Sequence, residues 1–187
     1  MESIRNDHTF QEKSIWSKTV DIPPRKPLAG SLTVEAAVIG AGMAGILTAF
    51  FLKQQGIDVV ILEADRIAGG QTKNTTAKIT SQHGMIYQKL IKKIGPKNAR
   101  LYACANEAAV HAYEKLIEKE NIDCHFEKLP SYLYTTDENR AKELEQETHA
   151  ASSLGISAHF TKVNDLPFET AAAVRLIIRH SFIHWNS

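Results

Sequence analysis

The sequence has few cysteines, the residues that form disulfides and often bind metals. Its two cysteines, Cys104 and Cys124, are too few for a disulfide framework or a cysteine-rich metal site, so we expect two free thiols and no metal. It also lacks any run of about 18 apolar residues, the length that spans a bilayer. Residues 1–18 carry no apolar core of the kind found in signal peptides. We therefore expect a cytoplasmic protein with no membrane partner.

An excess of charge of one sign is absent as well. Lysine and arginine together number 22 and aspartate and glutamate 21, which leaves a net charge of +1. A chain so balanced gives no electrostatic reason to expect nucleic acid or an anionic membrane as a partner. With 187 residues, of which 43% are hydrophobic, the chain is long enough for a globular domain with its own core.

The N-terminal residues differ in composition from the rest of the chain. Residues 1–31 contain Pro23, Pro24 and Pro27, few apolar residues and no clear period, so we expect an extended or poorly ordered arm. Trp16 either anchors this arm on the following domain or is a surface aromatic residue.

A strand, a helix and a second strand come after the arm in quick succession. Residues 32–39 are rich in Val, Ile and Ala and end at Gly40, as expected for a buried parallel strand. Residues 43–55 place apolar side chains at helical spacing before Gly56, and residues 59–62 form a second apolar run. This βαβ unit predicts an α/β fold, a Rossmann-like FAD/NAD(P)-binding domain whose parallel sheet is flanked by helices.

The pattern after this unit is weaker. Residues 64–83 are polar, and a long irregular stretch inside a compact domain is usually functional. Beyond it we expect a helix over 85–94, a second helix from Pro96 to Lys119, short strands at 125–126 and 132–134, and a helix capped by Asp137 that runs to Leu154. The apolar face expected for the second helix consists of Tyr102, Ala105, Ala109, Tyr113 and Leu116.

The turn between the first strand and its helix carries a G-x-G-x-x-G motif. Gly40 lets the chain turn tightly, Gly42 lets a pyrophosphate approach the backbone, and Gly45 lets helix and strand pack closely. The helix that starts there presents free N–H groups to the pyrophosphate. Glu63 follows the second strand, where its carboxylate can accept both hydroxyls of an adenosine ribose. That carboxylate would repel a 2′-phosphate, so FAD or NAD is favoured over NADP.

The residues after Glu63 separate FAD from NAD. Arg66, Gly69, Gly70 and Thr72 form an R-x-x-G-G-x-T run directly after the acid. Together with the glycine motif, this run resembles the FAD-dependent oxidoreductases related to glycine and D-amino-acid oxidases, the DAO type.

One stretch is similar to a narrower group within that family. Residues 74–84, N-T-T-A-K-I-T-S-Q-H-G, resemble a bacterial subgroup in which a Rieske iron–sulfur domain often follows the oxidoreductase domain. The resemblance covers residues 30–175 and is specific over residues 40–84.

The resemblance implies FAD as the cofactor and oxidation of an amine or amino acid by hydride transfer to the flavin. It implies that Thr72 touches the phosphates and that Thr75, Thr76 and Lys78 lie near the flavin ring. Lys78 either stabilises negative charge on the reduced ring or is a solvated loop lysine, and His83 is expected to be structural. The predicted cofactor-binding residues are Gly40, Gly42, Met43, Ala44, Gly45, Glu63, Ala64, Arg66, Gly70, Thr72, Thr75, Thr76 and Lys78.

The sequence departs from the family in length. Family members are much longer, and their substrate domain and late glycine-rich segment, which closes over the flavin, are missing here. The C-x-H and C-x-x-H pairs of a Rieske centre are missing too. We therefore expect residues 32–175 to be the N-terminal part of an incomplete FAD-binding domain. No catalytic residue is assigned, because the substrate-binding residues would lie in the absent portion.

The last twelve residues, 176–187, look foreign to the family. They run L-I-I-R-H-S-F-I-H-W-N-S, without caps or turn residues. One base inserted after the codon of Arg175 in a permitted back-translation gives F-D-N-Q-A-Q-F-H-P-L-E-F, which is similar to the family. We therefore expect a frameshifted tail, and a natural short protein with its own ending is the alternative.

Three functions are consistent with these observations. The chain is the front part of an FAD-dependent oxidoreductase acting on a small molecule, a truncated fragment without activity, or a small NAD- or nucleotide-binding module. The run after Glu63 argues against the third function. The absence of the closing segment favours the truncated fragment for the isolated chain.

Overall fold

The computed structural model describes residues 21–164, 166–177 and 180–182, the last three by their backbone alone. The chain divides into two compact units, Met1–Thr76 and Ala77–Ser187. Trp16 and most of the expected arm lie outside the described residues.

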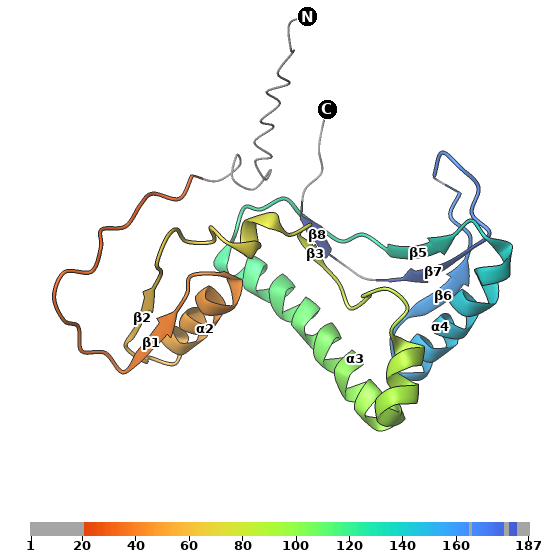
Figure 1. Cartoon of the computed structure of the whole chain (residues 1–187), viewed down its shortest axis with the longest axis horizontal. Helices are drawn as coiled ribbons and strands as arrows, with labels where there is room; N and C mark the ends of the chain where they lie inside the picture. Colours follow the sequence, from red (N-terminus) through yellow and green to blue (C-terminus); the bar gives the residue numbers. More distant parts are fainter. Residues whose placement is uncertain (1–20, 165, 178–179, 183–187) are drawn as a thin grey trace, which may run out of the picture. The chain divides into compact units, whose positions relative to one another are not determined.

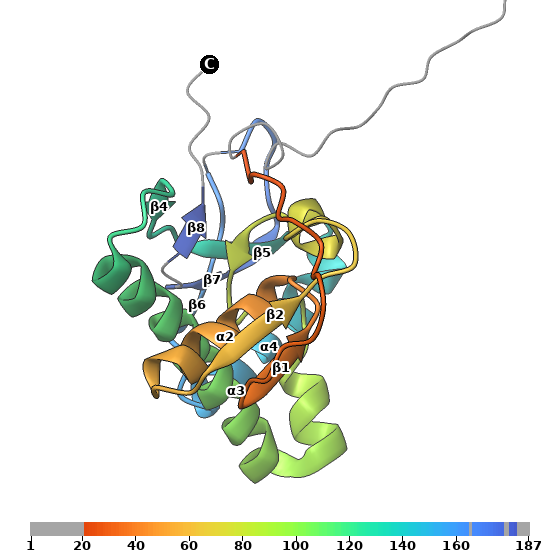
Figure 2. The ribbon, with the colours of Figure 1, turned by 90° about the vertical axis from the view of Figure 1, so that its left-hand side faces the viewer.

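The first unit is built on the predicted βαβ unit. Strands β1 (Ala36–Ile39) and β2 (Val59–Leu62) pair in parallel, and α2 (Met43–Gln54) connects them and packs against both. Figure 2 shows the two strands side by side with α2 against them. Gly56 follows the helix with φ 81°, as expected for a residue that ends a helix. The first strand is shorter than predicted, because its partner β2 offers only four residues for pairing.

This unit has a small core and a large open surface. Ala49 of α2 is buried where the helix meets the sheet. Ile39, in contrast, is 79% exposed at the end of β1, and Phe51 of α2 is 49% exposed. Among the described residues no third strand joins β1 and β2, so the parallel sheet is incomplete, as predicted.

The described part of the second unit combines antiparallel sheets with the helices α3 and α4 (Figure 1). One sheet has the order β5-β7-β6 and the other β3-β8-β4. The sequence did not predict β6, β7 or β8. The elements in chain order are β3 (Lys78–Ile79), α3 (Tyr87–Glu120), β4 (Phe126–Glu127), β5 (Ser131–Thr135), α4 (Ala141–Ser153), β6 (Ala158–Thr161), β7 (Ala172–Leu176) and β8 (His180–Phe182).

Helix α3 consists of two helical segments joined at Gly95. Gly95 has φ 77° and ψ 160°, which are not helical values, and Pro96 begins the second segment as predicted. The buried face of that segment was predicted wrongly. The structure buries Ala99, Ala103, Val110 and Ile117, and it leaves Ala105 and Ala109 exposed. Small apolar residues occur on more than one side of this helix, so their spacing alone selected the wrong side.

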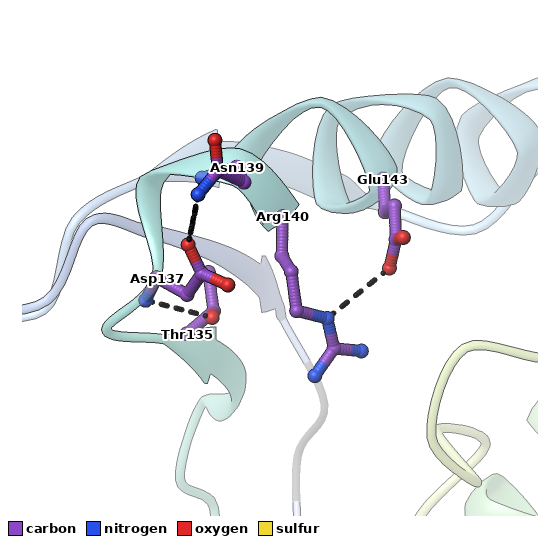
Figure 3. Close-up of polar contacts among 5 residues, drawn as sticks. All are labelled: Thr135, Asp137, Asn139, Arg140 and Glu143. Atoms are coloured by element: carbon purple, nitrogen blue, oxygen red, sulfur yellow. Dashed lines mark hydrogen bonds and ion pairs between the residues drawn. The ribbon is translucent and has the colours of Figure 1, made fainter.

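Asp137 caps the chain where β5 leads into α4, as predicted (Figure 3). Its side chain accepts from the backbone N–H of Asn139 at 2.9 Å, and its own N–H donates to the Thr135 hydroxyl at 3.1 Å. The capped element is a short 3₁₀ turn, η2 (Glu138–Arg140), from which α4 continues. In the same view Arg140 reaches Glu143 at 3.3 Å, one turn further along.

The core of the second unit lies between α4, the start of α3 and the β5-β7-β6 sheet. It includes Tyr87, Leu144, Val174 and Leu176, each at most 2% exposed. The Tyr87 hydroxyl donates to the carbonyl of Ser81, and burial raises the pKa of Tyr87 to about 12. The hydroxyl therefore stays protonated and keeps donating across the physiological pH range.

Parts of the predicted tail take part in this unit. Leu176 ends β7 in the core, and the backbone of residues 180–182 forms β8 between β3 and β4. Trp185 lies outside the described residues, and the foreign origin of residues 176–187 stays a prediction. No helix in the described part of the chain is long and apolar enough to cross a bilayer.

Candidate functional site

The glycine turn of the first unit brings the start of α2 directly onto the end of β1. Gly40 has φ 96°, and its N–H donates to the carbonyl of Leu62 at 2.7 Å. A Cβ added to Gly45 would lie 2.0 Å from the carbonyl oxygen of Gly40 and 3.3 Å from the side chain of Val38. Gly40 and Gly45 thus have the roles predicted for them, a tight turn and a close helix–strand contact.

The N-terminus of α2 is open to an anion. Its N-cap residue is Gly42, which provides no side-chain cap, and its first turn has no acidic residue. The N–H of Met43 donates to the Thr72 hydroxyl at 3.1 Å. The helix end therefore keeps a partial positive charge, and a hydroxyl lies beside it that can also donate to a ligand.

Glu63 reaches the same turn from the end of β2. One oxygen of its carboxylate accepts from the N–H of Ala41 at 2.7 Å, and the other accepts from the N–H of Asp65 at 3.0 Å. These bonds, that of Ala41 first, lower the pKa of Glu63 below its ordinary value. The carboxylate is exposed, ionised at neutral pH and able to accept further hydrogen bonds from a ligand.

The segment after Glu63 folds back onto the glycine turn. Ala68, with φ 56°, donates its N–H to the carbonyl of Ala41 at 2.8 Å. A 3₁₀ turn, η1 (Gln71–Asn74), then carries Thr72 to the start of α2. The R-x-x-G-G-x-T run therefore returns to the glycine motif.

The structure brings only some of the predicted residues together at one place. Gly42, Gly45, Glu63 and Thr72 gather around one turn. Other predicted residues of this unit have exposed side chains or, for Gly70, an exposed backbone, and their roles stay predictions: Met43, Ala44, Ala64, Arg66, Gly70, Thr75 and Thr76.

Lys78 and His83 belong to the second unit. Lys78 is exposed at the start of β3, and its proposed place beside a flavin stays a prediction. The ring of His83 lies 3.4 Å from the side-chain oxygen of Asn106, a contact that agrees with a structural role.

Sequence reasoning missed two backbone groups of the site. The N–H of Ala41 binds Glu63 and the carbonyl of Ala41 binds Ala68, so both polar groups of this residue hold the site together. The sequence does place these groups in the motif, because Ala41 occupies the variable position between two motif glycines. The sequence gave no indication that Ala68 has a positive φ, because alanine seldom adopts one.

The donor set of this site suits a dinucleotide and not a metal. The N-terminus of a helix attracts a phosphate, and an ionised carboxylate accepts from ribose hydroxyls. No group of three or more histidine, cysteine or acidic side chains among the described residues could hold a metal ion, and both cysteines are free thiols.

Comparisons with known proteins agree with this geometry. The family profile described as FAD dependent oxidoreductase, DAO, matches residues 35–171. A putative Rieske 2Fe-2S iron–sulfur protein, YhfW of Bacillus subtilis (strain 168), is 34% identical over 179 residues, which are 95% of this chain and 35% of that protein. The gamma-glutamylputrescine oxidoreductase of Escherichia coli (strain K12) is 26% identical over 66% of this chain and 29% of that protein.

A solved structure shows the same fold. The L-amino acid deaminase from Proteus vulgaris superposes with a TM-score of 0.62 and 19% identity over 84% of this chain and 37% of that chain. The present chain spans about a third of the length of these two curated relatives, 35% and 29%.

Proposed function

The chain belongs to the family of FAD-dependent oxidoreductases, and from this premise we propose that its first unit binds FAD for the oxidation of an amine or amino acid. The observation that carries the proposal is the meeting of Glu63, Thr72 and the start of α2 at one turn. We further propose a cytoplasmic location, and that residues 32–175 are the front part of the enzyme.

Each residue of the turn has a proposed task. The carboxylate of Glu63 accepts from the ribose hydroxyls, and the start of α2 faces the pyrophosphate beside the bare backbone of Gly42. The Thr72 hydroxyl, which accepts from Met43, turns to donate to a phosphate oxygen. Bound FAD supplies the acceptor for a hydride, and the residues of this chain bind and orient it. Thr75, Thr76 and Lys78 are proposed to lie near the flavin ring.

The names of the relatives support the substrate class. One relative is an oxidoreductase of gamma-glutamylputrescine, which is an amine, and the structural neighbour is an L-amino acid deaminase. We infer that the whole protein acts on a small molecule of the same kind, an amine or amino acid.

The alternative is a truncated fragment without catalytic activity. It is favoured by the exposed end of β1, where Ile39 is 79% exposed and no third strand pairs among the described residues. In this case the chain binds FAD weakly or not at all and oxidises nothing.

A cofactor titration tests the proposal. We expect the purified chain to bind FAD with a yellow flavin absorbance and a saturable calorimetric signal, and to bind NADP more weakly, because Glu63 repels a 2′-phosphate. Binding of NAD without FAD would contradict the family-based proposal. Weak or absent FAD binding, with no oxidation of an amine or amino acid, would favour the alternative.

Glu63→Gln is expected to weaken FAD binding about tenfold or more, as the loss of a charged acceptor does. Glu35→Gln is the matched control, since Glu35 also accepts a backbone N–H, that of Asp58 at 2.7 Å, at the other end of the same strands. Its FAD affinity should stay at the wild-type value. Equal affinities in calorimetric titrations of both variants would remove Glu63 from the site.

The same carboxylate sets a pH dependence. Since the pKa of Glu63 is lowered from 4.5, the group stays ionised as the pH falls to 4.5, and its contribution to FAD binding is lost only below that value.

A further inference from the structure

The outer face of the β5-β7-β6 sheet carries a row of hydrogen-bond donors. Arg175 of β7 lies between Tyr132 of β5 and His159 of β6, and the three residues are directly paired in the antiparallel register. Side chains directly opposite one another in such a sheet share a face. Val174 and Leu176, on either side of Arg175, belong to the core that α4 covers (Figure 1). The row therefore faces away from α4.

Arg175 is a cation without its usual partner. Its side chain is partly buried, and its Nε is a buried donor with no hydrogen bond. No acidic side chain in the described segments lies within ion-pair distance of it. Burying a donor without a partner is unfavourable, so this guanidinium group is poised for an anion. The Tyr132 hydroxyl and the His159 ring add two further donors on its flanks.

A second row on the same face contains an aromatic ring. It consists of Tyr134, Ala173 and Thr161, which are paired across the three strands and lie two residues away from the first row on each strand. The ring of Phe168 packs on Tyr134 with 5.7 Å between centroids. Tyr134 is 44% and Phe168 45% exposed, so both rings offer apolar surface beside the donor row.

We propose that this face binds a small organic acid, with the carboxylate on Arg175 and the apolar part against Tyr134 and Phe168. Guanidinium and carboxylate form paired, charge-assisted hydrogen bonds, and the aromatic row gives the rest of the acid its contact. This proposal does not rest on the proposed function, because a simple acid would bind this face without FAD.

NMR titration of the full chain, without FAD, tests the site with benzoate, benzamide and acetate as probes. We expect benzoate to shift the Arg175 Nε–H resonance saturably. Benzamide should bind at least about tenfold more weakly than benzoate, because it lacks the charge. Acetate should also bind more weakly than benzoate, because it lacks the ring. Equal binding of benzoate and benzamide would overturn the proposal, and equal binding of benzoate and acetate would overturn the role of the aromatic row.

Substitutions complete the test. Arg175→Met should abolish benzoate binding, and Arg175→Lys should keep a weakened affinity, which excludes misfolding as the cause of the loss. Arg140→Met is the control, since Arg140 already has a partner in Glu143. Benzoate binding that survives in Arg175→Met would overturn the proposal. The FAD titration of the same wild-type sample is a separate result, so failure of one proposal leaves the other standing.

Discussion

Gly45→Ala is expected to destabilise the first unit by roughly 3 kcal/mol, the upper end of the usual cost of overpacking. The added Cβ would lie 2.0 Å from the carbonyl oxygen of Gly40 and 3.1 Å from its carbonyl carbon. These are backbone atoms of a tight turn, so no flexible side chain can move aside. Relief requires the start of α2 to move away from β1, which also disturbs the hydrogen bonds that Ala41 and Met43 make to Glu63 and Thr72.

Gly42→Ala is the matched variant for this prediction. Gly42 has φ −77° and ψ 179°, which alanine adopts readily, and its added Cβ would lie 3.5 Å from the Thr72 hydroxyl, an ordinary contact. We expect its folding stability to stay at the wild-type value and its FAD affinity to fall, because the Cβ holds the pyrophosphate away.

Hydrogen exchange measured on peptides from residues 43–54 separates the two glycine variants. Exchange in α2 should become much faster in Gly45→Ala and stay unchanged in Gly42→Ala, because only the first substitution lifts the helix from the sheet. Unchanged protection of α2 in Gly45→Ala would show that the close contact with Gly40 is not needed.

The first unit was predictable because its determinants are local. The apolar runs, Gly40 and Gly56 lie next to one another in the sequence, and each fixes a conformation that depends little on distant residues. Glu63 was predictable for the same reason, since it directly follows the second strand.

The antiparallel sheets depend on pairings between distant residues. β7 was missed although it is the central strand of its sheet, because Ala172 and Ala173 have no strand propensity to reveal it. Its burial comes from β5, paired through Leu133 and Val174, and from α4, which covers it. The donor row around Arg175 could not be predicted from the sequence for the same reason, because only the pairing of the three strands aligns its residues.

Glu147→Ala is expected to destabilise the second unit by about 3 kcal/mol, because two backbone donors at the start of α3 would lose their acceptor. Glu147 is 3% exposed in α4, and its two oxygens accept from the N–H of Tyr87 at 2.7 Å and of Gln88 at 3.0 Å. Ile86, the residue before the helix, has no side-chain acceptor to replace it. A negative charge at this place also favours the positive end of the helix.

Glu147→Gln and Glu145→Ala distinguish this cap from a general effect of charge. The glutamine keeps one acceptor oxygen and replaces the other with a donor, so its loss of stability should lie between the wild type and Glu147→Ala. Glu145 is on the same helix but exposed, and its substitution should leave the unfolding midpoint in urea unchanged. Equal midpoints for Glu147→Ala and Glu145→Ala would contradict the cap. The expected order of stabilities would show that the carboxylate of Glu147 in α4 fixes the residue at which α3 begins. The sequence does not reveal this contact, because Glu147 and Tyr87 are 60 residues apart.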